Sequence, residues 1–427
     1  MADLAHEASP TAATAHRHPA GSARAAFAYR DFRWFWIGLF LSSIGTWMQN
    51  LALPAYIEER THSATWVSIL VFAQLGPLLL LAIPGGLIAD RVRPKPWLIF
   101  CQTEQAVMCL VLAWCVARHA SLWAIFAAQL AVGIGNALNA PASQASMPLM
   151  VDRRDLDGAV SLNSVMMNGS RVTGPALAAV LGVWGVTTSQ IFVVNAISFL
   201  FLIGILLMIH VPKAARHAGV QGWRRALIGW QIARGRRSLS RLLTTLFFFS
   251  LVGLVFVALY PSVIRRNLGL DPEGTTYKWL YAVWGFGALL GALAVSTVLR
   301  KIDRRKLIVG GFAGFGAFMF VFALLRDVGP AFPTVFLLGI CYFVTITAMA
   351  TLFQQNLHDT ERASVMPLWI MAFGGTVTIG GLIFGPIIDA IGARWVLLLS
   401  AATSFALAWW CDLRRLQPDD FIVQVTH

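Results

Sequence analysis

The sequence is a succession of apolar runs of about twenty residues, separated by charged turns or by turns that contain Gly and Pro. A helix rises about 1.5 Å per residue, so a run of this length can cross the ~30 Å hydrocarbon core of a bilayer. Hydrophobic residues make up 57% of the 427 residues and charged residues only 12%, against about a quarter in soluble domains. The runs therefore predict an all-α integral membrane protein and exclude a soluble fold.

The runs predict twelve transmembrane helices in two six-helix halves. The first six cover residues 33–57, 64–88, 97–117, 121–147, 157–183 and 187–211, and the second six cover 242–264, 276–299, 306–325, 332–353, 363–389 and 393–413. Two sets of six around a polar linker indicate an internal duplication. We expect a disordered tail (1–28), an N-terminal half (29–211), a basic linker (212–241), a C-terminal half (242–413) and a short tail (414–427).

The formal net charge of +13 follows the loops. Most Lys and Arg residues lie in the N-terminal tail, the even-numbered loops, the linker and the C-terminal tail. Because positive loops stay in the cytoplasm during insertion, we expect both termini to be cytoplasmic, and the basic charge needs no nucleic-acid partner. The linker mixes basic and apolar residues at helical spacing, which fits either a helix on the lipid surface or a simple basic tether.

No catalytic or metal-binding pattern is present in the sequence. All five cysteines fall inside apolar runs without a CxxC spacing, and the chain contains no GxxxxGK[ST], HExxH or GxSxG motif. We therefore expect no enzyme activity, no metal and no cofactor. Without a phosphate-binding loop for ATP, an ion gradient is the default energy source.

The most specific local pattern is GLIADRVRPK, which runs from Gly86 to Lys95 between the second and third predicted spans. Glycine allows close helix approach, while the carboxylate of Asp90 can cap a helix and pair with an arginine, so the cluster can act as a breakable conformational latch. The pattern resembles the loop 2–3 signature of the major facilitator superfamily, which Gly86, Asp90, Arg91 and Lys95 match. Arg93 stands where the superfamily usually has glycine.

The first half also resembles the branch that includes enterobactin-type siderophore exporters and macrolide efflux pumps, the third drug:proton antiporter family. The segments that carry this resemblance are 42–54, 139–142 and 163–177. The resemblance implies the major facilitator fold, alternating access, and export driven by inward proton flow. We expect a monomer in the bacterial inner membrane that exports a small amphipathic molecule, siderophore-like or drug-like. The alternative is an importer or a lipid or metabolite facilitator on the same fold.

Polar residues inside the predicted spans are candidates for substrate binding, because the membrane tolerates them mainly where they face a cavity or another helix. Arg171 lies near the middle of the fifth span on a polar face. It could hold an anionic substrate or a carboxylate, or it could tie helices together. We expect Gln49, Asn139 and Asn168 to join it in binding substrate, with hydrogen bonding between helices as the alternative.

Carboxylates in and near the spans are candidates for proton coupling. Glu104 lies a third of the way into the third span, where a carboxyl group can carry a coupled proton or can pair with a loop arginine. Asp389 ends the eleventh span and is either a second coupling residue or a hydrated helix-end residue. Glu58 and Glu59 follow the first span, and we expect both to be solvated.

Overall fold

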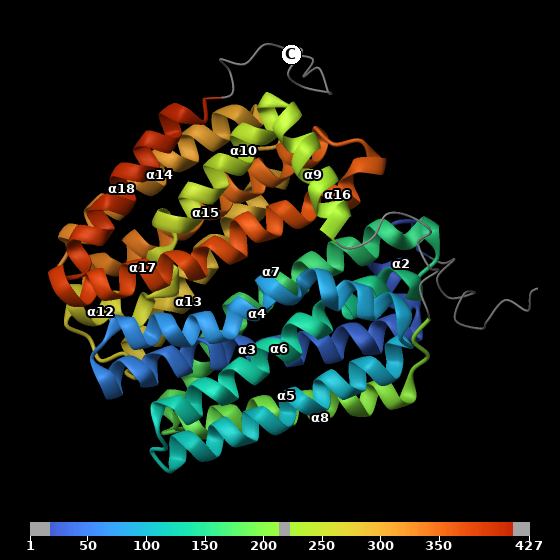
Figure 1. The fold of residues 1–427 in the computed structure, drawn as a ribbon, viewed down its shortest axis with the longest axis horizontal. Coiled ribbons are helices and arrows are strands. Elements are labelled where there is room, and N and C mark those ends of the chain that lie inside the picture. The colour runs from blue at the N-terminus through green and yellow to red at the C-terminus, as the bar shows by residue number, and fades with distance from the viewer. Residues whose placement is uncertain (1–17, 213–222, 413–427) are drawn as a thin grey trace, which may run out of the picture. The chain divides into compact units, whose positions relative to one another are not determined.

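A computed structural model describes residues 18–212 and 223–412, and the regular elements in this part of the chain are helices (Figure 1). Those of the first half are α2 (Ala23–Ala28), α3 (Arg30–Thr61), α4 (Ala64–Arg91), α5 (Pro94–Ala117), α6 (Leu122–Ser146), α7 (Leu156–Val183) and α8 (Thr188–Met208), with short 3₁₀ turns at Met147–Met150 and Arg153–Asp155. Those that follow are α9 (Trp223–Gly235), α10 (Arg237–Phe248), η3 (Phe249–Gly253), α11 (Val255–Ala258), α12 (Tyr260–Leu268), α13 (Thr275–Ser296), α14 (Arg304–Leu324), α15 (Val328–Gln355), α16 (Asp359–Ile370), η4 (Met371–Gly375), α17 (Thr376–Ile391) and α18 (Ala393–Trp410).

The predicted fold class is confirmed, and the count of twelve spans is consistent with the helices. Within residues 18–212 and 223–412, nine helical stretches are long and apolar enough to cross a membrane. The 32-residue α3 and the 28-residue α7 coincide with the first and fifth predicted spans. These two helices are not among the nine and carry more polar residues than the nine do. The seventh predicted span is not among the nine either, because it is broken into short helices.

Two predicted spans are interrupted by π-helical turns, which a periodicity of 3.6 residues does not predict. The predicted span over 242–264 is helical but not regular, because η3 interrupts it and α11 and α12 follow as separate short helices. The carbonyl group of Gly253 accepts a hydrogen bond from Ser400 Oγ on α18 at 3.1 Å. Gly380 of α17 packs against the Leu251 carbonyl, where a β-carbon would overlap it. Neighbouring helices therefore fill the space around the interruption at η3.

The chain forms two compact units. Unit 1 comprises residues 1–49, 81–174 and 189–218, and unit 2 comprises residues 50–80, 175–188 and 219–427. In unit 1, one apolar cluster joins the beginnings of α3 and α5 to α8 through Phe32, Phe35, Leu98, Leu202 and Leu206, all at most 1% exposed. The same cluster includes Ala142 of α6 and Met166 of α7, so it also contacts the helices that carry Asn139 and Arg171.

Aromatic rings and glycines hold unit 2 together. The ring of Phe249 lies edge-on to Phe312 at 5.0 Å and to Phe315 at 5.2 Å between centroids, which joins η3 to α14. Gly287 and Gly291 of α13 lie directly against backbone carbonyl groups of α15, so that a β-carbon at either would overlap the carbonyl. Glycines four residues apart allow two helices to approach this closely. Figure 1 also shows α9 lying beside α16 in this unit.

Candidate functional site

All the predicted site residues except Asp389 belong to unit 1. The motif residues Gly86 and Asp90 lie in the last turns of α4, but the surroundings of Gly86 and the side chain of Asp90 are outside what the structure describes. Lys95, at the start of α5, donates hydrogen bonds from Nζ to the carbonyl oxygens of Leu207 at 3.0 Å and Ile209 at 2.9 Å. A cation at the C-terminal carbonyls of α8 also complements the helix dipole. Arg91 is exposed, and the role of the four residues as a latch stays a prediction.

Gln49 is 2% exposed and lies at the centre of a network that joins four helices. Its Oε1 accepts hydrogen bonds from Asn195 Nδ2 at 2.6 Å and Cys109 Sγ at 3.0 Å, and its Nε2 donates to Gln129 Oε1 at 3.3 Å. These partners come from α8, α5 and α6. Because both ends of the amide are engaged inside the bundle, the geometry favours hydrogen bonding between helices over substrate binding.

Arg171 of α7 stacks on an aromatic ring of α3. Its guanidinium carbon lies 4.9 Å from the centroid of the Trp47 ring, a distance at which a cation is attracted to the face of the ring. Asn168, one turn earlier, donates from Nδ2 to the Ser164 carbonyl at 2.9 Å. Asn139 of α6 is 9% exposed and accepts a hydrogen bond from Gln102 on α5. Arg171 and Trp47 thus place a positive charge beside an aromatic ring, and the role of Arg171 in substrate binding stays a prediction.

Glu104 of α5 is half-buried and points its carboxylate at a glycine of α6. A β-carbon at Gly135 would overlap Glu104 Oε2, so the glycine provides the space that the carboxylate occupies. This oxygen is buried, and none of the residues in the described part of the chain donates a hydrogen bond to it. A carboxyl oxygen without a donor inside a membrane span is costly in its charged form and is a functional candidate by default.

Asp389 of α17 caps the first turn of α4 and belongs to a charged group, the Asp389 cluster, made of Glu58, Glu59, Arg265, Arg266 and Asp389. The Asp389 carboxylate accepts hydrogen bonds from the backbone N–H groups of Ala64 at 2.8 Å and Thr65 at 3.0 Å, and from the hydroxyl groups of Ser63 and Thr65. An aspartate in this position satisfies N–H groups that a helix leaves unpaired.

The expectation that Glu58 is solvated is wrong. Its side chain is 0% exposed and pairs with Arg266 Nη1 at 3.1 Å, and Ser262 donates a further hydrogen bond to it. Arg266 Nη2 bonds Asp389 at 2.6 Å and the His62 carbonyl at 2.7 Å, so one guanidinium joins α3, α12 and α17. Glu59 pairs with Arg265 nearer the surface. The sequence contains the adjacent pairs Glu58-Glu59 and Arg265-Arg266, but it does not show that they contact each other across 208 positions.

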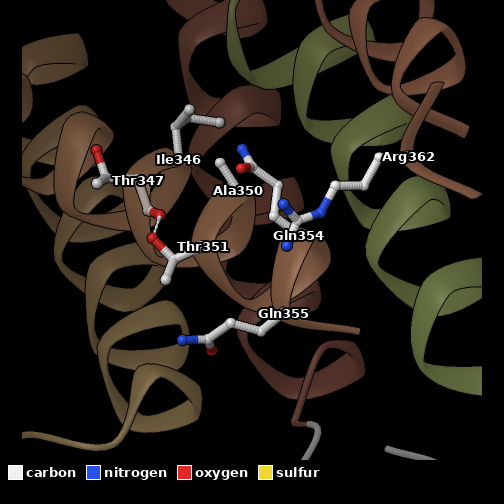
Figure 2. A pocket seen from close by; sticks show the side chains of 7 residues that line it. All are labelled: Ile346, Thr347, Ala350, Thr351, Gln354, Gln355 and Arg362. Carbon is white, nitrogen blue, oxygen red and sulfur yellow. Dashed lines mark hydrogen bonds between the residues drawn. The ribbon is translucent and has the colours of Figure 1, made fainter. Parts of the chain in front are cut away.

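A cavity of about 440 Å³ opens in unit 2 between α15 and α16. Figure 2 shows the side chains that line it, with Arg362 of α16 extending toward Gln354 of α15. The lining residues are Ile346, Thr347, Ala350, Thr351, Gln354, Gln355 and Arg362. The polar members of α15 are spaced four and three residues apart and so lie on one face of the helix. This spacing was visible in the sequence, but the position of Arg362 beside this face was not.

Comparison with known proteins places these features in a family. The model of the family described as transmembrane secretion effector matches residues 21–423. The staphyloferrin A transporter of Staphylococcus aureus is 25% identical over 84% of this chain and 90% of its own. The enterobactin exporter of Citrobacter koseri is 24% identical over 87% and 88% of the two chains. The macrolide efflux protein A of Streptococcus pyogenes is 23% identical over 90% and 95%.

Solved structures agree with the fold. A bacterial homolog of the human lysosomal transporter Spinster, in an inward-facing and unoccupied conformation, superposes with a TM-score of 0.74 at 14% sequence identity. The match covers 92% of this chain and 99% of that one. The chain therefore belongs to the transmembrane secretion effector family of the major facilitator superfamily, and it is a multi-pass membrane transporter of small molecules and not an enzyme.

Proposed function

We propose that this protein exports a small amphipathic organic molecule across the bacterial inner membrane in exchange for protons. The observation that carries the proposal is the Glu104 carboxyl group, which lies in a membrane-spanning helix and has one buried oxygen without a hydrogen-bond donor among the described residues. A carboxyl group in this setting can exchange a proton at a small cost in rearrangement, because no strong partner has to be broken. Two relatives, the enterobactin exporter and the macrolide efflux protein A, act in export and support this direction.

The Asp389 cluster supports alternating access. With both termini in the cytoplasm, the α3–α4 turn and the end of α12 face outward, and the cluster ties these ends of the two halves together. In this proposal the cluster is the closed outer gate. Export requires the Arg266 contacts to Glu58 and Asp389 to break and form again in each cycle.

The same geometry gives Arg171 and Trp47 a role in the proposed cycle. A guanidinium stacked on an indole ring offers a positive charge and an aromatic face side by side. An acidic, aromatic substrate could contact both groups, whereas a cationic drug would be repelled by Arg171. The pair therefore favours an anionic over a cationic substrate.

The test is substrate uptake into everted membrane vesicles that carry the wild-type protein, Glu104→Gln or Asp327→Asn. Glu104→Gln keeps the shape of the side chain and removes its titratable group, so we expect uptake driven by a proton gradient to fall to the level without a gradient. Asp327 is an exposed helix-start residue whose side chain makes no capping hydrogen bond, and Asp327→Asn should transport like the wild type. Full gradient-driven uptake by Glu104→Gln would remove Glu104 from the mechanism.

A further inference from the structure

The linker helix α9 packs on α16 through one narrow face. Gly229 and Ala233 lie four residues apart on this face, and both are buried. A β-carbon at Gly229 would overlap the Ser364 carbonyl of α16, so the glycine allows the two backbones to touch. In Figure 1, α9 runs alongside α16 and α10 continues from its end. This contact fixes which side of α9 faces away from α16.

An ion pair holds the end of α9 in the same orientation. Arg236, which lies between α9 and α10, donates from both terminal nitrogens to the Glu361 carboxylate, at 2.8 and 2.6 Å, and from Nη1 to the Asn356 carbonyl at 3.0 Å. The Glu361 carboxylate also accepts from the backbone N–H of His358 at 3.1 Å. Burial opposes ionisation of Glu361, but the hydrogen bonds from Arg236 and His358 outweigh it and lower the pKa of Glu361. The negative charge of Glu361 is therefore balanced by Arg236.

The free side of α9 is both apolar and basic. Leu227 is 61% exposed and Trp230 is 56% exposed, and Arg234 is exposed as well. These positions are three and four residues apart, so they form one stripe along the helix, the α9 stripe. At 3.6 residues per turn, the stripe lies about a third of a turn from Gly229 and Ala233. Exposed leucine and tryptophan side chains beside an arginine are typical of a helix that lies in the surface of a bilayer.

The neighbours of α9 indicate that the stripe lies near the bilayer surface. At 13 residues α9 is too short to cross a bilayer, and α10 leads into the seventh predicted span directly after it. The Arg241 guanidinium carbon of α10 lies 5.1 Å from the centroid of the Trp410 ring of α18, and tryptophan is enriched at membrane–water interfaces. Arg241 follows the end of α9 by six residues, which is at most about 9 Å along a helix. Lipid headgroups are therefore within reach of the α9 stripe.

The charge of this region favours one kind of lipid. Residues 223–248 contain six arginines and no acidic residue. Arg236 is paired with Glu361, whereas Arg234 and the exposed Arg237 make no ion pair with the described residues. A guanidinium matches phosphate oxygens with two parallel N–H groups, and basic residues at a bilayer surface attract anionic lipids.

We propose that the α9 stripe is a docking surface for anionic phospholipid at the bilayer surface. Leu227 and Trp230 enter the boundary between headgroups and acyl chains, and Arg234 and Arg237 bind the phosphate groups. The proposal selects the surface helix over the simple basic tether, which the linker sequence left open. It does not depend on the transported substrate or on the coupling ion.

Quenching of Trp230 fluorescence in the full-length protein tests the proposal. The protein is placed in nanodiscs that hold phosphatidylglycerol and phosphatidylcholine in one fixed ratio, with bromine on the acyl chains of either the first lipid or the second. Only the location of the quencher then differs between samples. Subtracting the signal of Trp230→Phe isolates Trp230 from the other tryptophans. We expect brominated phosphatidylglycerol to quench Trp230 several-fold more than its share of the lipid predicts.

Charge variants identify the groups that select the lipid, each measured with its Trp230→Phe counterpart. Arg234→Gln should lower the relative affinity for phosphatidylglycerol by up to about fivefold, and Arg234→Gln/Arg237→Gln should lower it further. Arg118 is an exposed arginine in the α5–α6 turn, so Arg118→Gln removes the same charge elsewhere and should leave Trp230 quenching unchanged. Salt at about 1 M should weaken the selection in the wild type, because the screening length falls to about 3 Å.

Three results would overturn the proposal. No quenching of Trp230 by either brominated lipid would show that the stripe does not touch the bilayer. Quenching by both lipids in proportion to their share would show contact without selection by charge. An unchanged relative affinity in Arg234→Gln/Arg237→Gln would show that these two arginines do not bind the headgroups.

Discussion

Replacing Arg266 by Gln should strongly destabilise the protein, because it removes the one cation that touches Glu58 and Asp389 together. Glu58 is 0% exposed and, among the contacts shown for the described residues, would keep its hydrogen bond from Ser262, whereas Asp389 would keep its four donors at the start of α4. Breaking a buried ion pair from one side costs about 3–5 kcal/mol. Since the Arg266 side chain is 22% exposed, we expect a value near the lower limit, about 3 kcal/mol.

A double-mutant cycle isolates this effect from general damage. Glu58→Gln removes the buried charge, so Glu58→Gln/Arg266→Gln should be more stable than the sum of the two single changes by at least about 1.5 kcal/mol. The control is Arg265→Gln, because its partner Glu59 has a side chain that is 39% exposed and the pair should contribute less than about 1 kcal/mol. The assay is the free energy of unfolding in mixed micelles. Additivity within about 0.5 kcal/mol would refute the idea that Arg266 balances a buried Glu58 charge.

Three further changes have defined outcomes. Gln49→Ala should lower the free energy of unfolding by about 1–3 kcal/mol, because Asn195, Cys109 and Gln129 lose their shared partner. Substrate affinity should not change. A loss of affinity without a loss of stability would instead identify Gln49 as a binding residue. Gly135→Ala should displace the Glu104 carboxylate at little cost in stability, because Oε2 is the free end of a flexible side chain, and it should lower uptake driven by a proton gradient. Gly204→Ala, with nothing near its β-carbon position, should leave this uptake unchanged, and equal uptake by the two variants would contradict the packing at Gly135. Arg236 donates hydrogen bonds to the Glu361 carboxylate, which lowers the pKa of Glu361 in the folded protein. At pH values above the ordinary carboxyl pKa of about 4.3, Glu361→Gln should therefore have a lower melting temperature than the wild type. This difference should disappear as the pH falls through the lowered pKa of Glu361, and a difference that does not change with pH would contradict a stabilising Arg236–Glu361 ion pair.

The positions of the helices were predictable from hydropathy, since each apolar run must form its own backbone hydrogen bonds in lipid. The π turns at Phe249–Gly253 and Met371–Gly375 were not, because a single extra residue in a helical turn leaves the apolar pattern almost unchanged. Their surroundings depend on contacts from other helices, such as Ser400 against the Gly253 carbonyl.

The candidate site was predictable only where one residue is informative by itself. Glu104 and Arg171 stood out because charges are rare inside spans. Gln49 could not be assigned, because a neutral amide serves equally well in a binding site or between helices, and only its three partners favour the second role. Glu58 was misjudged because its partner Arg266 lies 208 positions away in the chain, and no local pattern reports such a pairing.

The central claim is that export is coupled to inward proton flow, and substrate-dependent proton movement tests it most directly. Everted vesicles that contain the wild-type protein are energised to an acidic interior and then given a panel of siderophores and macrolides while the interior pH is followed. The account predicts that at least one anionic substrate releases protons from the vesicles as it is taken up, and that Glu104→Gln abolishes this release. Uptake of substrate with no proton movement in the wild type would contradict it.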